Sequence, residues 1–308
     1  MSLLSRIDDC ITKLKSILPV DHILLQAPMS EQTTFKIGGP ADCLIFPGSI
    51  EEIQQIIRLT KKYDVPCTII GNGSNILVLD KGIRGIVLKF GRQMSYVRCT
   101  DDFMIAGCGA LLADLSKFAA SNLLTGFEFA VGIPGSIGGA IFMNAGAYGG
   151  EIKNVVTAVT AVTAEGKIVR YDEEQLGFGY RQSIFQKNAN VICEVEISLK
   201  KGEKSEILAA MVDYTQRREN KQPLELPSAG STFKRPAGYY AGTLIDQTGL
   251  KGLKVGGAQI SMKHAGFVVN TGNATAADVL NLIAEVQKRV YEKHGVRLYP
   301  EVRLIGEK

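Results

Sequence analysis

Two glycine-rich segments contain the residue types that could bind a ligand through the backbone. Residues 131–150 read VGIPGSIGGAIFMNAGAYGG, with seven glycines among twenty residues and no charge, and residues 71–75 read GNGSN. Glycine has no Cβ atom and tolerates positive φ, so the backbone can come close to another group. Backbone N–H groups that no side chain covers suit an anion such as a pyrophosphate. The two segments therefore predict two loops that hold an extended dinucleotide from both sides.

Neither segment fits a more familiar motif. A Rossmann fingerprint needs a third glycine where Ile76 stands, and no G-K-[ST] follows to make a P-loop. The uncharged run from Phe129 to Gly150 has the length of a membrane helix. However, Pro134 interrupts it, and each glycine costs a helix about 0.8–1 kcal/mol relative to alanine. A flexible linker would lack the large apolar residues of this run. We therefore expect a buried loop system and no membrane span.

The first loop must be positioned by the elements before it. Ser49 and Glu52 form an S-x-x-E capping box, which predicts a helix from there to about residue 62. Residues 65–70, VPCTII, predict the next strand. GNGSN follows directly, so the loop is expected at the end of the second strand of a β-α-β unit.

Elsewhere, helices and strands do not alternate regularly. The patterns predict an N-terminal amphipathic helix whose apolar face comprises Leu4, Ile7, Ile11, Leu14 and Leu18. Further helices are predicted over 204–219 and over 276–294, where Thr275 and Asp278 cap the second. A strand is predicted over 190–200, and a strand pair over 157–171 with a turn at Glu165-Gly166. Such a mixture is typical of an α+β fold. The proline-punctuated residues 221–230 predict a domain boundary.

Composition limits the class of protein. The 308 residues are 45% hydrophobic and 21% charged, which is typical of a globular protein. The net charge is only +4, and no run of basic residues indicates nucleic-acid binding. The N-terminus mixes charges into its apolar pattern, unlike a signal peptide. The six cysteines and three histidines show no zinc-type spacing. We expect a cytoplasmic protein with reduced thiols and no metal.

A set of ordered motifs gives the sequence a family resemblance. The motifs are FKIGGPAD (35–42), GNGSNILV (71–78), GIPGSIGGAIFMNAGAYG (132–149), YRQSIF (180–185), AGSTFKRP (229–236), GTLIDQTGLKG (242–252), GGAQISMKHAGFVVN (256–270) and YPEVRLIG (299–306). Together they resemble the UDP-N-acetylenolpyruvoylglucosamine reductase (MurB) family over nearly the whole chain. Only about fifty residues separate YRQSIF from AGSTFK, so the chain resembles the shorter, type II branch.

The resemblance implies a fold and a division of the chain. The fold is α+β, with a two-subdomain FAD-binding part of the vanillyl-alcohol-oxidase (PCMH) type and a smaller α+β substrate-binding domain. The expected bounds are 1–94 for FAD-binding subdomain 1, joined by 299–308, then 95–219 for subdomain 2 and 220–298 for the substrate-binding domain.

The resemblance also implies FAD as the cofactor. The candidate cofactor-binding residues are Gly71, Asn72, Gly73, Ser74, Asn75, Gly132, Pro134, Gly135, Ser136, Ile137, Gly138, Gly139, Asn144, Ala145 and Gly146. Related flavoenzymes attach FAD covalently through His or Cys, and neither residue occurs between 109 and 192. We therefore expect a noncovalent, dissociable FAD.

The implied activity is reduction of UDP-N-acetylglucosamine enolpyruvate to UDP-N-acetylmuramate, a step of peptidoglycan precursor synthesis. NADPH would be the co-substrate, reducing the flavin, whose N5 then gives hydride to C3. By resemblance, Arg181 binds the substrate carboxylate, Glu301 acts beside it, and Ser231 gives the proton to C2. Arginine suits a carboxylate because its planar guanidinium holds two oxygens at once. Lys221 and Lys234 are alternatives for restoring the proton of Ser231.

Further residues are implied to contact the anionic UDP-sugar. The candidates are Tyr180, Arg217, Lys221, Arg235, Tyr240 and Lys251. Position 243 is Thr where many relatives have a basic residue, so a phosphate contact is not expected there. The expected protein is a monomer with no nucleic-acid or membrane partner. Two other classes stay open at this point: a different FAD oxidoreductase of the same fold acting on an alcohol or sugar, and a nucleotide-binding module without catalysis.

Overall fold

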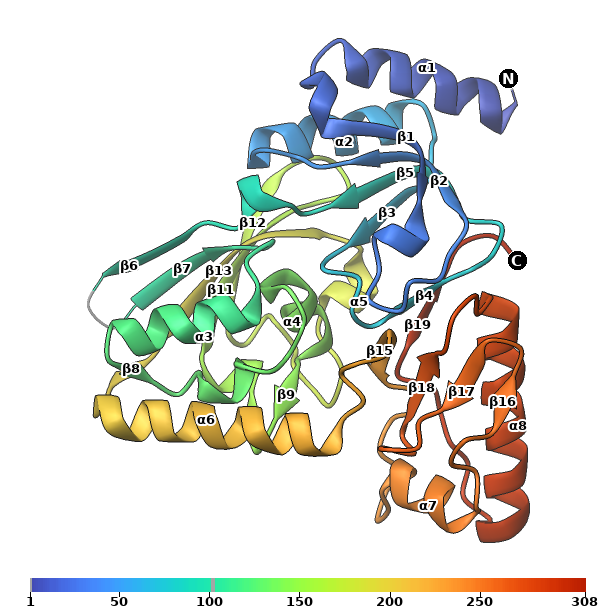
Figure 1. Ribbon diagram of the computed structural model, residues 1–308. Coiled ribbons are helices and arrows are strands. Elements are labelled where there is room, and N and C mark those ends of the chain that lie inside the picture. The colour runs from blue at the N-terminus through green and yellow to red at the C-terminus, as the bar shows by residue number, and fades with distance from the viewer. Residues whose placement is uncertain (1, 101–102) are drawn as a thin grey trace. The chain divides into compact units, whose positions relative to one another are not determined.

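The structure is a computed structural model that describes residues 2–100 and 103–308 (Figure 1). The chain divides into two units, each assembled from separate stretches of sequence. The first unit comprises Met1–Leu25, Cys43–Asn72 and Gly85–Arg217, and the second comprises Gln26–Asp42, Gly73–Arg84 and Arg218–Lys308. The chain passes from the first unit to the second between Asn72 and Gly73, inside the first glycine loop.

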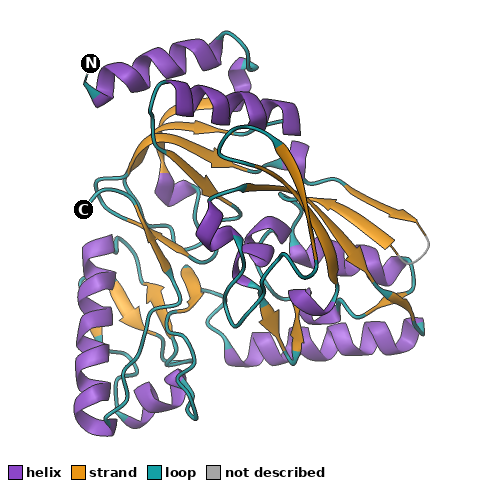
Figure 2. Ribbon diagram, turned by 180° about the vertical axis from the view of Figure 1, so that it is seen from behind, coloured by secondary structure: helices purple, strands orange, loops and turns teal. Residues whose placement is uncertain are grey.

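A five-stranded antiparallel sheet forms the centre of the first unit. Its strand order is β12-β11-β13-β7-β6. The strands are β6 (Val97–Thr100), β7 (Phe103–Gly107), β11 (Val156–Val162), β12 (Ile168–Asp172) and β13 (Val191–Ser198). β11 and β12 form the predicted pair, and Gly166 in their turn has φ +73°. Figure 2 shows these strands twisting together in one layer.

Most buried helix residues of this unit pack with the sheet, whereas Ile207 and Met211 form a separate cluster with Ala120. The helices that follow the sheet strands are α3 (Leu112–Ser121), α4 (Ile137–Met143), α5 (Phe185–Asn188) and α6 (Lys204–Lys221). α4 contacts β7 and β13 and buries Ile137 and Ile141 completely. The second glycine segment therefore includes a short helix that is built into the core.

The N-terminal helices are packed side by side. They are α1 (Leu3–Lys15) and α2 (Ile50–Lys62), followed by β3 (Cys67–Ile70), as predicted. Ile7, Ile11 and Leu14 of α1 are buried, but Leu4 is 65% exposed. The expectation for Leu4 was wrong, because the core does not extend to the first turn of the helix.

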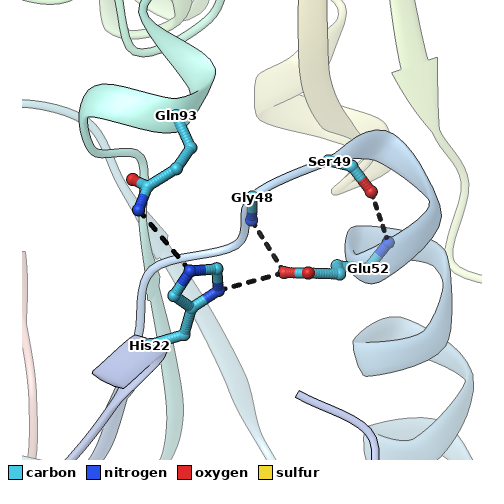
Figure 3. A network of polar contacts seen from close by, with 5 residues as sticks. All are labelled: His22, Gly48, Ser49, Glu52 and Gln93. Atoms are coloured by element: carbon cyan, nitrogen blue, oxygen red, sulfur yellow. Dashed lines mark hydrogen bonds and ion pairs between the residues drawn. The ribbon is translucent and has the colours of Figure 1, made fainter. Parts of the chain in front are cut away.

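A polar network around His22 fixes the start of α2 (Figure 3). The hydroxyl of Ser49 accepts a hydrogen bond from the Glu52 N–H at 3.2 Å, which is half of the predicted capping box. The Glu52 carboxylate accepts from the N–H of Gly48 at 2.7 Å and lies 3.3 Å from His22 Nδ1. Nε2 of Gln93 lies 3.5 Å from the other ring nitrogen of His22. Glu52 thus links the start of α2 to His22, and His22 in turn meets Gln93.

A second sheet has the strand order β1-β2-β5-β3. Its further strands are β1 (Ile23–Pro28), β2 (Pro40–Ile45) and β5 (Ile83–Lys89). β3 and β5 are parallel, with Cys67 opposite Ile86. The small pairs β8 (Leu124–Thr125) with β14 (Lys200–Lys201) and β9 (Gly146–Ala147) with β10 (Gly150–Glu151) are antiparallel.

The second unit packs a helix against an antiparallel sheet of order β15-β18-β17-β16. Its elements are β4 (Ile76–Val78), β15 (Ser228–Ser231), α7 (Ala241–Gln247), β16 (Lys254–Val255), β17 (Ala258–Ile260), β18 (Phe267–Asn270), α8 (Ala276–His294) and β19 (Arg303–Ile305). α8 has the predicted Thr275–Asp278 capping box and ends at Gly295 with φ +69°. Asp80 also accepts from the Ala276 and Ala277 N–H groups at 2.8 and 3.0 Å, which ties the segment after β4 to this helix.

Two further features of the described chain concern its helices and its cysteines. None of its helices combines the length and the apolar character needed to cross a membrane. The six cysteines are thiols that form no disulfide in the described chain, and four of them, Cys10, Cys43, Cys108 and Cys193, are buried.

Candidate active site

The two glycine segments meet within the first unit at Gly71 and Ser136. A Cβ atom added to Gly71 would lie 2.4 Å from Oγ of Ser136, which is closer than a real Cβ contact allows. Next to this point, Nδ2 of Asn72 donates a hydrogen bond to the carbonyl of Pro134 at 2.7 Å. The first half of GNGSN therefore packs directly on the turn before α4, and a larger residue at position 71 would have to displace the Ser136 hydroxyl.

Ser136 carries an unsatisfied polar group at this junction. It is 1% exposed, and its hydroxyl has no hydrogen-bond partner in the described part of the chain. Buried hydroxyls nearly always have a partner, so this one indicates a ligand atom or a water. The adjacent N–H groups of Ile137 and Gly138 already donate to the carbonyls of Ala110 and Cys108, at 2.8 and 2.9 Å.

The glycines of the second segment differ in how much space the surrounding protein leaves for a side chain. A Cβ on Gly138 would lie 3.0 Å from Cβ and the carbonyl oxygen of Cys108, and one on Gly146 would lie 2.6 Å from the carbonyl of Gly150. These two positions are restricted by the protein itself. A Cβ on Gly139, by contrast, would meet only the Ser136 hydroxyl, at 3.6 Å. Gly139 and Ser136 together form a cradle with space and an unused hydroxyl.

The remaining candidate cofactor residues of the first unit flank α4. Gly132, Pro134 and Gly135 precede the helix, and the Gly135 carbonyl accepts from the Leu112 N–H at 3.0 Å. Asn144 ends α4 in the left-handed region, at φ +42°. Ala145 and Gly146 follow it, and the Ala145 N–H donates to the Ala140 carbonyl at 2.9 Å.

Asn144 is 1% exposed and uses its whole amide on the protein. Its Nδ2 donates to Glu151 Oε2 at 2.9 Å and to the Gly179 carbonyl at 3.0 Å, and its Oδ1 accepts from the Lys153 N–H at 3.0 Å. The side chain of Asn144 therefore connects α4 to the segment before Arg181.

The second half of the first loop, Gly73 to Asn75, belongs to the second unit. Gly73 has φ +69°, and a Cβ there would lie 2.5 Å from the Gln32 carbonyl. Nδ2 of Asn75 donates to the Glu301 carbonyl at 3.3 Å, and the Arg303 N–H donates to the Asn75 carbonyl at 3.0 Å. Asn75 thus anchors the loop to the C-terminal strand β19 and the residues before it.

Two of the candidate catalytic residues lie close together in the second unit. Ser231 is the last residue of β15, is exposed and pairs with Phe267 of β18. The N–H of Glu301 donates to the carbonyl of Thr232 at 2.8 Å. Glu301 is therefore fixed beside the residue that follows Ser231, and Ser231 and Glu301 belong to one local structure.

Arg181 belongs to the first unit, in a tight turn. Gly179 and Gln182 exchange backbone hydrogen bonds of 3.1 and 3.2 Å, with Tyr180 and Arg181 between them. The guanidinium carbon of Arg181 lies 4.9 Å from the centre of the Tyr180 ring, and Tyr180 is 55% exposed. A cation over an aromatic face is a favourable contact that also orients the guanidinium.

Three other candidate substrate residues, Arg217, Arg235 and Tyr240, already have partners within their own units. Arg217 makes a two-pronged ion pair with Asp213, at 2.9 and 2.8 Å. The guanidinium carbon of Arg235 lies 4.0 Å from the ring centre of Tyr240. Each of these side chains is therefore oriented within its own unit before any ligand binds.

The sequence analysis missed His264, which lies near two of the candidate lysines. Lys251, one of them, is paired with Asp246 at 2.8 Å. Nδ1 of His264 accepts a hydrogen bond from the Gly266 N–H at 3.0 Å. Burial lowers the pKa of His264 below its ordinary value, and the positive charges of Lys251 and Lys221 lower it further. The signal was its place in the motif SMKHAGF, but the histidines were considered only as metal ligands.

Comparison with known families defines the class of this protein. Residues 41–172 match the FAD binding domain family, and residues 222–305 match the C-terminal domain of UDP-N-acetylenolpyruvoylglucosamine reductase. Alkyldihydroxyacetonephosphate synthase has a similar fold, with a TM-score of 0.50 and 17% identity over 63% of this chain and 40% of its own. The chain thus has the α+β FAD-binding fold of the vanillyl-alcohol-oxidase (PCMH) type joined to a second domain, as predicted.

Closer relatives define the family. UDP-N-acetylenolpyruvoylglucosamine reductase of Syntrophomonas wolfei is 50% identical over 290 residues, 94% of this chain and 97% of its own. The Clostridium kluyveri enzyme is 47% identical over 304 residues, 99% of this chain and 100% of its own. The crystal structure of MurB from Thermus caldophilus has a TM-score of 0.79 and 37% identity, covering 92% of this chain and 98% of that one. The chain belongs to the UDP-N-acetylenolpyruvoylglucosamine reductase family and is an FAD oxidoreductase.

Proposed function

We propose that this protein reduces UDP-N-acetylglucosamine enolpyruvate to UDP-N-acetylmuramate with NADPH, in the cytoplasm, as a step of peptidoglycan precursor synthesis. Family membership and the FAD binding domain support the proposal. The structural observation that carries it is the hydrogen bond between the Glu301 N–H and the Thr232 carbonyl. It joins Glu301 to the segment of Ser231, so that an acid and a hydroxyl come from the same local structure.

The reaction adds hydride to C3 and a proton to C2 of the enolpyruvyl group. Bound FAD, reduced by NADPH, would supply the hydride from N5. The carboxylate conjugated to the double bond takes up negative charge as hydride arrives, so the protein must stabilise that charge and deliver one proton. In this proposal Arg181 binds the carboxylate through two donors, Glu301 orients it, and Ser231 Oγ gives its proton to C2. Lys221 or Lys234 would restore the proton of Ser231.

FAD would be held noncovalently by the two glycine segments. The Ser136 hydroxyl is an unused buried donor, and Gly139 leaves space above it, so these two residues fit a pyrophosphate. Asn72 and Gly71 shape the other side of the cradle. Acid precipitation is expected to leave the flavin in the supernatant, and flavin that stays with the precipitate would show a covalent link.

The residues that we propose to contact the UDP-sugar offer both charge and aromatic surface. This group comprises Tyr180, Arg217, Lys221, Arg235, Tyr240 and Lys251. Arginine and lysine suit a diphosphate, and tyrosine can stack on uracil. Arg217, Arg235 and Lys251 already have carboxylate or aromatic partners, so substrate binding would exchange one partner for another.

The test is NADPH oxidation by the FAD-loaded protein with and without UDP-N-acetylglucosamine enolpyruvate. We expect one NADPH to be consumed per bound flavin before substrate is added, and sustained loss of nicotinamide absorbance only afterwards, with one NADPH consumed per product. Simple alcohols and sugars serve as the comparison substrates. Oxidation driven by one of these, and not by the enolpyruvyl sugar, would assign the chain to a different oxidoreductase of the same fold. A protein that takes up no FAD would overturn the proposal altogether.

A further inference from the structure

Arg181 has a backbone conformation that arginine rarely adopts. Its φ is +55°, in the left-handed region that favours glycine. It occupies the third position of the turn between Gly179 and Gln182, where tight turns with positive φ usually have glycine or asparagine. Such strain persists only where the surrounding structure holds it, and it concentrates at functional positions.

A side-chain hydrogen bond from Gln186 on α5 holds the Arg181 backbone. Nε2 of Gln186 donates to the Arg181 carbonyl at 2.9 Å and to the Phe142 carbonyl of α4 at 2.7 Å. One amide group therefore uses both of its hydrogens to bridge the strained residue and the helix of the second glycine segment. The Ser183 hydroxyl donates to the same Phe142 carbonyl at 2.9 Å, which strengthens the connection on the α4 side.

The other end of the turn is tied to the same helix. Asn144, at the end of α4, donates to the Gly179 carbonyl at 3.0 Å. Gly179 and Arg181 are thus both tied to the C-terminal end of α4, through Asn144 and through Gln186 on Phe142. Asn144 contacts Gly179, whereas Gln186 contacts Arg181 itself, so Gln186 has the more direct influence on where the guanidinium points.

We propose that Gln186 is a positioning residue that sets the direction of the Arg181 guanidinium relative to the flavin-side helix α4. This inference rests on the proposed function, in which Arg181 binds the substrate carboxylate. Gln186 itself touches neither substrate nor cofactor. Its effect is transmitted through the Arg181 carbonyl, because rotation of this peptide group changes ψ of Arg181, on which the allowed side-chain rotamers depend.

Replacing the amide without changing its size isolates this effect. Gln186→Leu keeps a similar shape and removes both donors. We expect FAD binding and flavin reduction by NADPH to stay within about twofold of wild type, while kcat/KM for the enolpyruvyl sugar falls about 10- to 100-fold, as small misplacements of a positioning group do. Gln186→Lys, which restores a donor for both carbonyls, is expected to recover part of the loss. The control is Gln182→Leu, a neighbouring exposed glutamine that joins the turn through its backbone.

A double-mutant cycle shows whether the effect passes through Arg181. In an Arg181→Ala background, Gln186→Leu should cause no further loss of kcat/KM, because the group it positions is gone. Equal losses in both backgrounds, or a Gln186→Leu enzyme with wild-type kcat/KM, would overturn the inference while leaving the proposed function standing.

A measurement without catalysis keeps the inference testable if the proposed function fails. Hydrogen exchange of the Gln182 N–H, which donates to the Gly179 carbonyl, reports the closed turn. Gln186→Leu should speed this exchange at least about tenfold while amides inside α8 stay unchanged. Unaltered exchange at Gln182 would mean that Gln186 does not hold the turn. If the wild-type enzyme does not oxidise NADPH with the enolpyruvyl sugar, the proposed function fails separately.

Discussion

Asn75 and Glu301 are 226 residues apart in the sequence and are joined by a hydrogen bond of 3.3 Å, from the Asn75 side-chain amide to the Glu301 carbonyl. The Arg303 N–H returns a bond of 3.0 Å to the Asn75 carbonyl. From there β4 and β19 continue side by side as a parallel pair, with Arg303 opposite Ile76. The last residue of a glycine loop thus holds in place the segment that carries a candidate catalytic acid.

Asn75→Ala is expected to affect the candidate acid more than the flavin. Removing one hydrogen bond of this kind costs about 0.5–1.5 kcal/mol of unfolding free energy. Because the lost bond leads to Glu301, reoxidation of the flavin by the enolpyruvyl sugar should slow, while reduction by NADPH should change little. Urea unfolding and anaerobic stopped-flow absorbance measure the two effects. Gln54→Ala, which removes a side-chain amide bond to the Gly166 carbonyl outside the candidate site, is the control. Equal slowing of both half-reactions would assign Asn75 to the flavin instead.

Gly139→Ala separates close approach of a ligand from packing of the chain. A Cβ there meets only the Ser136 hydroxyl at 3.6 Å, so the protein has room for it. Since alanine is favoured over glycine inside a helix by about 0.8–1 kcal/mol, the FAD-free protein should unfold at slightly higher temperature. If the flavin lies against this position, its affinity should nevertheless fall.

The matched control for that experiment is Gly138→Ala. Its Cβ would lie 3.0 Å from Cys108, so stability and flavin binding should fall together. Calorimetry of the FAD-free proteins and flavin titration measure both quantities. A Gly139→Ala protein with wild-type FAD affinity would exclude a cofactor contact at that glycine.

Ser231→Ala should divide the catalytic cycle into an unaffected and an affected half. Flavin bleaching by NADPH needs no proton on the sugar ether, so its rate should stay near wild type. Protonation of C2 loses its donor, and a general acid is typically worth about 10²–10⁴-fold. We therefore expect reoxidation by the enolpyruvyl sugar to slow at least about 10²-fold in stopped-flow experiments. If neither phase slows, the proton comes from another group, and Glu301 is the next candidate.

His264 makes stability depend on pH below neutrality. Its folded-state pKa is lowered from 6.5, chiefly by burial and also by Lys251 and Lys221. The unfolded chain therefore binds a proton more readily than the folded protein. Its contribution to stability is present above the unfolded pKa of 6.5 and is lost as the pH falls toward the folded pKa.

The pH dependence of urea unfolding tests this assignment. His264→Gln keeps an acceptor for the Gly266 N–H and removes the titrating ring, so the unfolding free energy should vary less between about pH 5 and 7. Lys251→Met removes a neighbouring positive charge, so the pKa of His264 should be lowered less. The unfolding free energy should then fall by a smaller amount as the pH decreases. An unchanged pH profile in His264→Gln would show that another group is responsible.

The sequence alone determined the local elements of this protein. Ser49 predicted the start of α2, and Thr275 with Asp278 predicted the start of α8, because a cap uses atoms only three residues apart. The glycine segments and the ordered motifs likewise led to the FAD-binding fold and to the family. These features depend on residue type and spacing, which the sequence states directly.

Only the tertiary structure decided what individual side chains do. Glu52 was expected to close its own capping box, but its carboxylate bonds to Gly48 and meets His22, which lies thirty residues earlier. Asn144 and Asn75 look like further members of ligand loops, yet their amides bind carbonyls 35 and 226 residues away. A hydrogen bond depends on which groups the folded chain brings within about 3 Å of each other, and sequence spacing does not contain that distance for remote residues. The strained turn of Arg181 and its contact with Gln186 follow from the same long-range packing, so they become visible only in the folded protein.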